Sequence, residues 1–270
     1  MNKAVAQQLE KAPNRKVYLS TIAIILTALI IWSFMGVNIT GFDQQGTRIA
    51  RNIFRGLFSP DLEFLFDFTS GGGVPGLLFE TIAIAFLGTV FGSFLAIPIS
   101  FLMSPSIVSR PVAFVTRLVV IFIRTIPSLV YGLMFIRVTG PGPYAGVLTM
   151  SLTSIGMISR LYVDVIENLD RGVLEAMTSM GCTTYQKVRY GILPQLFSSF
   201  LSVTIYRYDM NLRDATILGL VGAGGIGAPL IFAMRSYRWS EVGSILIGLV
   251  VLILAVEIFS NKLRERLVNG

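Results

Sequence analysis

The chain has 270 residues, of which 53% are hydrophobic and only 14% are charged, and its mean hydropathy is +0.72. Soluble domains carry about 25% charged residues, so this composition excludes an ordinary water-soluble core and indicates a membrane protein. A single cysteine excludes an intrachain disulfide, the absence of histidine removes the commonest metal ligand and general base, and the net charge of +7 fits basic flanks of membrane spans rather than nucleic-acid binding.

Six windows of about 20 mostly apolar residues, the length that crosses the hydrocarbon core, predict six membrane-spanning helices. The first window lacks a convincing small-residue cleavage site, so we interpret it as an uncleaved span rather than a signal peptide. The windows are residues 17–37, 77–103, 112–137, 143–165, 195–218 and 240–261. The sequence therefore predicts an all-α, polytopic bundle of six transmembrane helices.

Basic residues flank both ends of the chain, four before the first span and three after the last. Because lysine and arginine resist translocation, both termini are predicted to be cytoplasmic, and by parity so is the loop at residues 166–194. Residues 38–76 balance acidic and basic side chains and are predicted to form an outside loop. We divide the chain into residues 1–76, with the first span and the external connection, and the core at residues 77–270.

The loop at residues 166–194 is polar, helix-compatible and too long for a tight turn. Residues 174–180 are predicted to form a short helix that Gly181 ends, and residues 184–190 a second one. Pro194 then falls in the first turn of the fifth span, where its missing N–H costs nothing. By shape alone, the loop could equally be an amphipathic segment on the lipid headgroups.

The fifth span carries Arg207, Asp209, Arg213 and Asp214, although each charge costs about 2.5–3.5 kcal/mol at the centre of a membrane. At 100° per residue, Arg207, Asn211 and Asp214 share one face. Asp209 and Arg213 form an i,i+4 pair on the opposite side, predicted to be an intramembrane ion pair. Arg207 and Asn211 are predicted to line a substrate pathway. The alternative is that the charges neutralise one another and hold the bundle together.

A glycine-rich run follows at residues 219–227. It lacks the lysine and following serine or threonine of a phosphate-binding ATPase loop, so ATP binding by this chain is not predicted. Such a break at the end of a span is tolerated where it is packed in protein or lines an aqueous cavity. We predict a gate or re-entrant segment, with close helix packing as the alternative. Its glycines are Gly219, Gly222, Gly224, Gly225 and Gly227.

Two further polar features lie in the third and fourth spans. Arg124 suits an oxyanion, since its guanidinium presents paired donors, but it could instead be held by carbonyls freed at Pro127. A polar stripe in the fourth span could line a path or hydrogen-bond a neighbouring helix. Its members are Thr149, Ser151, Thr153 and Ser154.

Glu175-Ala176, then Gly181, then Ile192-Leu193-Pro194 resembles the "EAA" loop of ABC-importer permeases, although Met177 replaces the second alanine of the triplet. The resemblance implies the type I ABC-importer permease fold. It also implies that residues 175–194 form a coupling loop, whose helix docks into a groove on an ATPase subunit.

The pattern from Tyr206 onward resembles part of the phosphonate and phosphite ABC permeases and reads Y-R-Y-D-x-N-x-R-x-x-T-x-L-G-L-V-G-A-G-G-I-G. Arg124-Thr125-Ile126-Pro127 and residues 140–148 look like further elements of that family, and the resemblance runs from about residue 77 to the C-terminus. The family usually has glutamate at Asp209. Ser128 stands where many relatives have a carboxylate, so the preferred substrate within the family stays open.

The resemblance implies a transport subunit rather than an enzyme, in the cytoplasmic (inner) membrane of a bacterium. It would assemble with a second copy of itself, two ATP-binding subunits that hold ATP and Mg, and a periplasmic or extracellular substrate-binding protein. Lipid would surround it, and it would bind no cofactor of its own and no nucleic acid. Phosphonate, phosphite or a related phosphorus oxyanion is the implied substrate. The alternatives are an importer of another small solute such as an amino acid, or a non-ABC channel. The expected pathway residues are Arg124, Tyr131, Arg207, Asn211 and Arg213.

Overall fold

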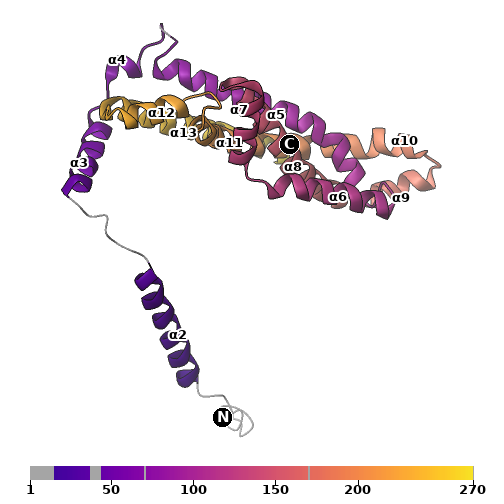
Figure 1. Cartoon of the computed structure of the whole chain (residues 1–270). Helices are drawn as coiled ribbons and strands as arrows, with labels where there is room; N and C mark the ends of the chain where they lie inside the picture. Colours follow the sequence, from indigo (N-terminus) through magenta and orange to yellow (C-terminus); the bar gives the residue numbers. More distant parts are fainter. Residues whose placement is uncertain (1–14, 37–43, 70, 170, 270) are drawn as a thin grey trace. The chain divides into compact units, whose positions relative to one another are not determined.

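The computed structural model describes residues 15–36, 44–69, 71–169 and 171–269, which are mostly helical and contain no strand (Figure 1). The chain divides into two compact units, Met1–Arg51 and Asn52–Gly270. The first unit contains α2 (Arg15–Gly36), whose residues 16–36 are long and apolar enough to span a membrane. The all-α prediction is thus confirmed for the described residues. Position 37 of the predicted first window lies outside them.

The segment predicted to be an outside loop contains two helices, α3 (Gln44–Phe58) and α4 (Leu62–Leu65). Asp61 begins α4, because its carboxylate accepts the N–H of Phe64 at 3.1 Å as an N-cap. The same residue joins α4 to the start of α13 (Trp239–Asn269). Its N–H donates to the carbonyl of Ser240 at 3.3 Å, and its own carbonyl accepts from the Ser244 hydroxyl at 2.8 Å.

The main unit is built around α5 (Val74–Met103) and α8 (Pro143–Glu167), the most extensive helix pair in the described structure. Gly88 and Gly92, one turn apart on α5, face Met150 and Ser154 of α8. A Cβ at Gly92 would lie 2.5 Å from that of Ser154, and one at Gly88 would overlap Met150. Glycine-x-x-x-glycine pairs of this kind let helix backbones approach closely in a membrane.

The third predicted span is a broken helix rather than a continuous one. It consists of α6 (Arg110–Thr125) and α7 (Ser128–Thr139), which are bent by 83° at the break. Pro127 causes the break, because it has no N–H to donate to the carbonyl of Ile123 and forces Ile126 into an extended conformation (φ −85°, ψ 125°). The Ile123 carbonyl instead accepts a hydrogen bond from the hydroxyl of Tyr131 at 3.0 Å.

The other helices of the main unit are α9 (Arg171–Ser179), α10 (Thr184–Gln186), the π-helix η1 (Lys187–Ile192), α11 (Leu193–Gly219) and α12 (Gly227–Arg235). Four described helices are apolar and long enough to span a membrane, or five if α6 and α7 form one span. The fifth predicted span is α11. Its 27 residues would reach about 40 Å, but its four charges keep it out of that apolar class.

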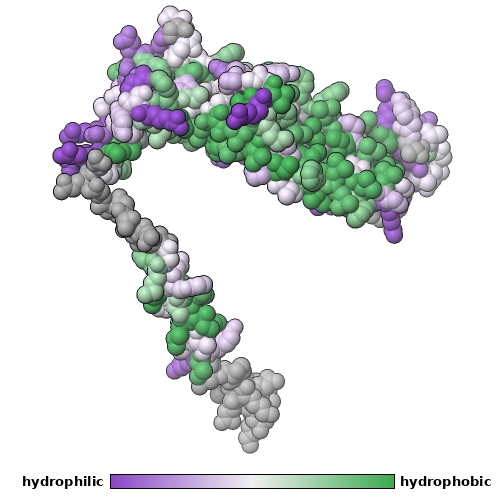
Figure 2. Space-filling view, in the orientation of Figure 1, coloured by the Kyte–Doolittle hydropathy of each residue, from purple (hydrophilic) through white to green (hydrophobic). Residues whose placement is uncertain are grey.

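Polar residues gather mainly at the two ends of this bundle, with a broad hydrophobic surface between them (Figure 2). One end carries α9 and α10, and the other carries α4 and α12 (Figure 1). Since α11 begins beside α10 and ends just before α12, it runs from one polar end to the other.

Candidate functional site

The predicted coupling loop forms helices with different boundaries from those expected. The first helix, α9, begins at Arg171 and ends at Ser179, and Gly181 follows it in the left-handed conformation with φ +76°, as its predicted capping role requires. The N–H of Cys182 closes this cap by donating to the carbonyl of Met177 at 3.0 Å. Glu175, Ala176 and Gly181 are exposed at this end of the bundle.

The second predicted helix does not end at residue 190 but continues through η1 into α11. Pro194 therefore lies in the first turn of α11, as predicted, but this turn continues from η1 instead of being a free helix start. It follows a π turn in which the Leu193 N–H donates to the carbonyl of Val188, and this wider turn accommodates a residue that has no N–H to donate. Ile192 is buried in the core, whereas Leu193 and Pro194 are exposed. Ile192 thus anchors the loop.

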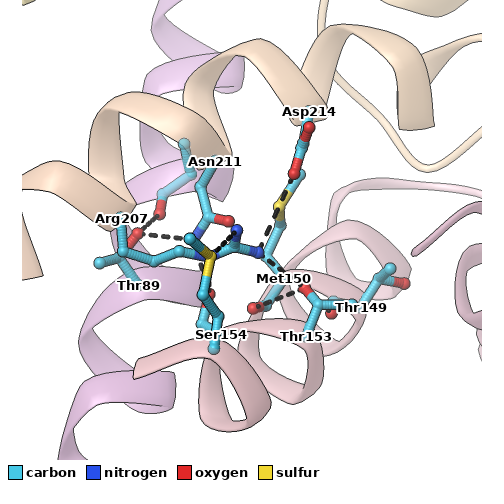
Figure 3. A network of polar contacts seen from close by, with 10 residues as sticks. Thr89, Thr149, Met150, Thr153, Ser154, Arg207, Asn211 and Asp214 are labelled. Carbon is cyan, nitrogen blue, oxygen red and sulfur yellow. Dashed lines mark hydrogen bonds and ion pairs between the residues drawn. The ribbon is translucent and has the colours of Figure 1, made fainter. Parts of the chain in front are cut away.

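Arg207 lies at the centre of a polar network between α8 and α11 (Figure 3). Its side chain is only 6% exposed and donates to the hydroxyl of Ser154 at 3.1 Å, to the sulfur of Met157 at 3.1 Å and to the hydroxyl of Thr153 at 3.3 Å. The carboxylate of Asp214 lies 3.9 Å away. The positive charge is therefore buried, but no carboxylate is within hydrogen-bonding distance of it in the described structure.

Asn211 ties a third helix into this network. Its side chain is fully buried, and its amide donates to the hydroxyls of Thr89 on α5 and Ser154 on α8, both at 2.8 Å (Figure 3). Its carbonyl oxygen is buried without a hydrogen-bond partner among the described residues. Arg207, Asn211 and Asp214 thus lie on one face of α11, as helical geometry requires. Of the polar stripe on α8, Thr153 and Ser154 bind this neighbouring helix.

The opposite face of α11 carries a second charge cluster. The guanidinium of Arg213 lies 3.0 Å from the buried carboxylate of Asp209 and 3.2 Å from that of Glu257 on α13. This cluster joins α11 to α13. The structure therefore does not bring Arg213 together with Arg207, although both were expected to line one pathway.

Arg124 and Tyr131 lie on either side of the break between α6 and α7. Tyr131 is buried, and its hydroxyl donates a hydrogen bond to the carbonyl of Ile123. Arg124 is exposed, its aliphatic stem lies against Gly156 of α8, and its guanidinium makes no hydrogen bond or ion pair within the described residues. It is thus not held by the carbonyls freed at Pro127, which was the alternative.

The glycine run forms a tight turn between α11 and α12, which we call the glycine turn (residues 219–227). Gly222, Gly224 and Gly225 have φ of +96°, +83° and +73°, a conformation that other residues rarely adopt. A Cβ at Gly219 would lie 2.7 Å from the Cα of Gly227, so the turn folds back on itself. The glycines therefore pack closely against other parts of the protein, which agrees with the alternative of close packing. The gating role of this turn stays a prediction.

Two side chains of α5 hold the glycine turn. The carboxylate of Glu80 accepts the N–H of Gly225, and the hydroxyl of Thr81 accepts the N–H of Ile226, both at 2.9 Å. Neither these residues nor Thr89 was a sequence-based candidate. A lone glutamate in an apolar span could have indicated Glu80, because such a charge is costly in a membrane. No group of three or more His, Cys, Asp or Glu that could hold a metal ion occurs in the described ranges.

Residues 88–269 match the family described as "Binding-protein-dependent transport system inner membrane component", which is more than half of the chain. The chain belongs to this family. It is therefore a membrane-embedded transport component and not an enzyme, as predicted. The permease is thus a multi-pass membrane protein of the ABC-transporter class.

Among its relatives, the permease is similar to the phosphite transport system permease protein PtxC of Stutzerimonas stutzeri, with 33% identity over 70% of this chain and 69% of PtxC. It is also similar to the phosphate-import permease protein PhnE of Mycolicibacterium smegmatis, with 34% identity over 72% of this chain. The matched region there is only 36% of PhnE.

Solved structures share the fold. The inward-facing MetNI methionine ABC transporter matches with a TM-score of 0.61 and 21% identity, over 70% of this chain and 94% of that chain. A bacterial ABC transporter involved in the import of the acidic polysaccharide alginate matches with a TM-score of 0.60 and 15% identity, over 96% and 99%. The predicted type I ABC-importer permease fold is confirmed.

Proposed function

We propose that the permease forms the membrane pathway of an importer for phosphite, phosphonate or a related phosphorus oxyanion. The observation that carries this proposal is the 33% identity to a phosphite permease over 70% of the chain. The chemistry of the site supports it. Phosphorus oxyanions present several acceptor oxygens, and arginine offers paired donors that match them.

Arg124 is the proposed contact for the anion. It is exposed at the break between α6 and α7, and its guanidinium has no partner among the described residues. Arg207 has a different proposed role, since its donors are directed to α8. Its buried guanidinium, with the Asp214 carboxylate at 3.9 Å, holds α11 against α8. Asn211 keeps the guanidinium in place through their shared partner Ser154.

The proposed assembly contains two copies of the permease, two ATPase subunits that bind ATP and Mg, and an external substrate-binding protein, in a bacterial cytoplasmic membrane with both permease termini inside. The helix α9 and Gly181 would dock on the ATPase, since Glu175 and Ala176 are exposed there while Ile192 anchors the loop in the core. Closure of the ATPase dimer would then move α11, which is continuous with the loop through η1. The pathway would open to one side of the membrane at a time.

Transport by the complex in proteoliposomes tests the substrate. We expect uptake of labelled phosphite that unlabelled phosphonate inhibits and methionine does not, and inhibition by methionine alone would refute the oxyanion proposal. Arg124→Ala is expected to raise the KM by about tenfold or more, the effect of losing one charge-assisted contact, with Arg124→Lys in between. Arg110→Ala is the matched control, because Arg110 is exposed at the other end of the same helix.

Co-purification of the ATPase tests the coupling loop. We expect Glu175→Arg to reverse the charge of an exposed docking residue and Gly181→Trp to disturb a left-handed backbone position. Both should lower ATPase binding and abolish its stimulation while the permease still folds. An intact complex with unaltered stimulation in both variants would rule out docking through α9.

A further inference from the structure

Glu80 stands out because its environment is unusual. It is the one charged residue among the 30 of α5, a helix with the length and apolarity of a membrane span. No basic side chain lies within 4.0 Å of it in the described structure, so its carboxylate is not part of an ion pair. Its hydrogen bond from the N–H of Gly225 is charge-assisted and offsets part of the cost of placing a carboxylate there.

The glycine turn is attached to the bundle on two sides. Glu80 and Thr81 of α5 hold its amides, as described above. On the other side, the carbonyl of Gly222 accepts the N–H of Gly142, just before α8, at 2.9 Å. A Cβ at Gly224 would lie 2.7 Å from the Cα of Pro143. The position of the turn is therefore set by α5 and by the beginning of α8.

The glycine turn is also continuous with α11 at its start and with α12 at its end. The helix α11 is continuous with η1 of the coupling loop at its start and enters the turn at Gly219, so a displacement at the loop can be transmitted along about 40 Å of helix. The same α5 carries Thr89, which binds Asn211 of α11. A movement of α11 relative to α5 that displaces the turn would therefore disturb the contact at Glu80.

We propose that Glu80 is a positioning residue for transport. Its carboxylate fastens the glycine turn to α5 in one position of the transport cycle and releases it when α11 moves. This inference rests on the gating role predicted for the turn and on the coupling through α11 in the proposed function. Glu80 belongs to none of the sequence motifs quoted above. In this proposal it nevertheless controls the end of the bundle opposite the coupling loop.

Amide hydrogen exchange of the assembled complex tests this attachment without any substrate. Glu80→Ala should speed exchange in peptides from the glycine turn by about tenfold, the effect of losing one such hydrogen bond, while peptides from α8 stay unchanged. Glu80→Gln should keep near-normal exchange, because its amide oxygen can accept the same N–H. Glu63→Ala on α4 is the control, since that exposed carboxylate lies at the same end without a described partner.

Thr81→Val is a second, independent variant, because it removes only the acceptor for the Ile226 N–H and should also speed exchange in the turn. Unchanged exchange in both Glu80→Ala and Thr81→Val would overturn the proposal. So would a Glu80→Gln variant as loosened as Glu80→Ala, because the hydrogen bond could then not be the cause.

The functional measurement is the amount of phosphite imported per ATP hydrolysed. Glu80→Ala should retain ATP hydrolysis but import several-fold less phosphite per ATP, and Glu80→Gln should restore the ratio. A purely structural role would instead lower complex yield and hydrolysis together, and that result would contradict a positioning role. If the wild-type permease imports no phosphite, the substrate proposal fails, but hydrogen exchange and ATP hydrolysis still decide the role of Glu80.

Discussion

Replacing Gly92 of α5 by alanine places a methyl group inside the contact between α5 and α8. Its Cβ would lie 2.5 Å from the Cβ of Ser154 and 2.9 Å from the carbonyl oxygen of Ser151. Carbon atoms pack best at about 3.5–4.0 Å, so the two helices must separate by about 1 Å. The same separation moves Ser154, whose hydroxyl accepts hydrogen bonds from both Arg207 and Asn211.

The expected cost follows from three contributions. Overpacking costs about 1–3 kcal/mol, and weakening two interhelical hydrogen bonds adds about 0.6 kcal/mol each. The better helix propensity of alanine returns about 1 kcal/mol. Gly92→Ala should therefore destabilise the protein by about 1–3 kcal/mol, or lower its melting temperature by about 2–12 °C, at about 2–4 °C per kcal/mol.

Thermal unfolding of the purified permease in detergent measures this effect, with phosphite uptake measured alongside. Gly36→Ala is the control, since a Cβ there meets nothing within 4 Å. It should leave the melting temperature unchanged or slightly raised, whereas Gly92→Ala should lower both the melting temperature and uptake. A Gly92→Ala protein that melts at or above the wild-type temperature would refute the close approach of α5 and α8.

Two further predictions concern α11 and the turn after it. Arg213→Ala should destabilise the protein by about 1–2 kcal/mol more than Asp209→Ala, because it leaves a buried carboxylate unpaired, although the half-exposed arginine limits the effect. Melting of both variants and of the double variant, which should recover part of the loss, checks this, and equal losses would contradict it. Gly224→Ala should abolish most uptake, whereas Gly140→Ala should cost only about 1–3 kcal/mol of backbone strain, because Gly140 combines a positive φ with an extended ψ of 165°. Both glycines have nearly the same φ (+83° and +84°), but only the Cβ at position 224 meets Pro143, so similar uptake in the two variants would refute steric control by the turn.

Local signals in the sequence predicted much of the fold. Apolar windows located the long helices, and the preference of glycine for a left-handed cap predicted the conformation of Gly181. Helical periodicity placed Arg207 and Asn211 on one face of α11 and Arg213 on the other. The effect of Pro127 was underestimated, since a window average does not register a single missing N–H, and the third span is bent by 83° there.

The partners of the candidate site could not be predicted in the same way. Glu80 contacts a residue 145 positions away, and Thr89 contacts Asn211 from 122 positions away. A pattern within one helix indicates which side chains share a face, but not which neighbouring helix covers that face. The Gly88–Gly92 pair was visible in the sequence and could have indicated a close helix contact, though not that α8 is its partner.

By itself, the sequence determined that the protein lies in a membrane, is helical and carries an exposed polar loop between spans, because composition and periodicity are local properties of the chain. It also carried the motifs that indicated an ABC-importer permease. Only the tertiary structure decided that Arg207 is directed into α8 while Arg124 stays open, and that Glu80 holds the glycine turn. These outcomes depend on which helices become neighbours, and that is set by packing at positions such as Gly92 rather than by any single segment.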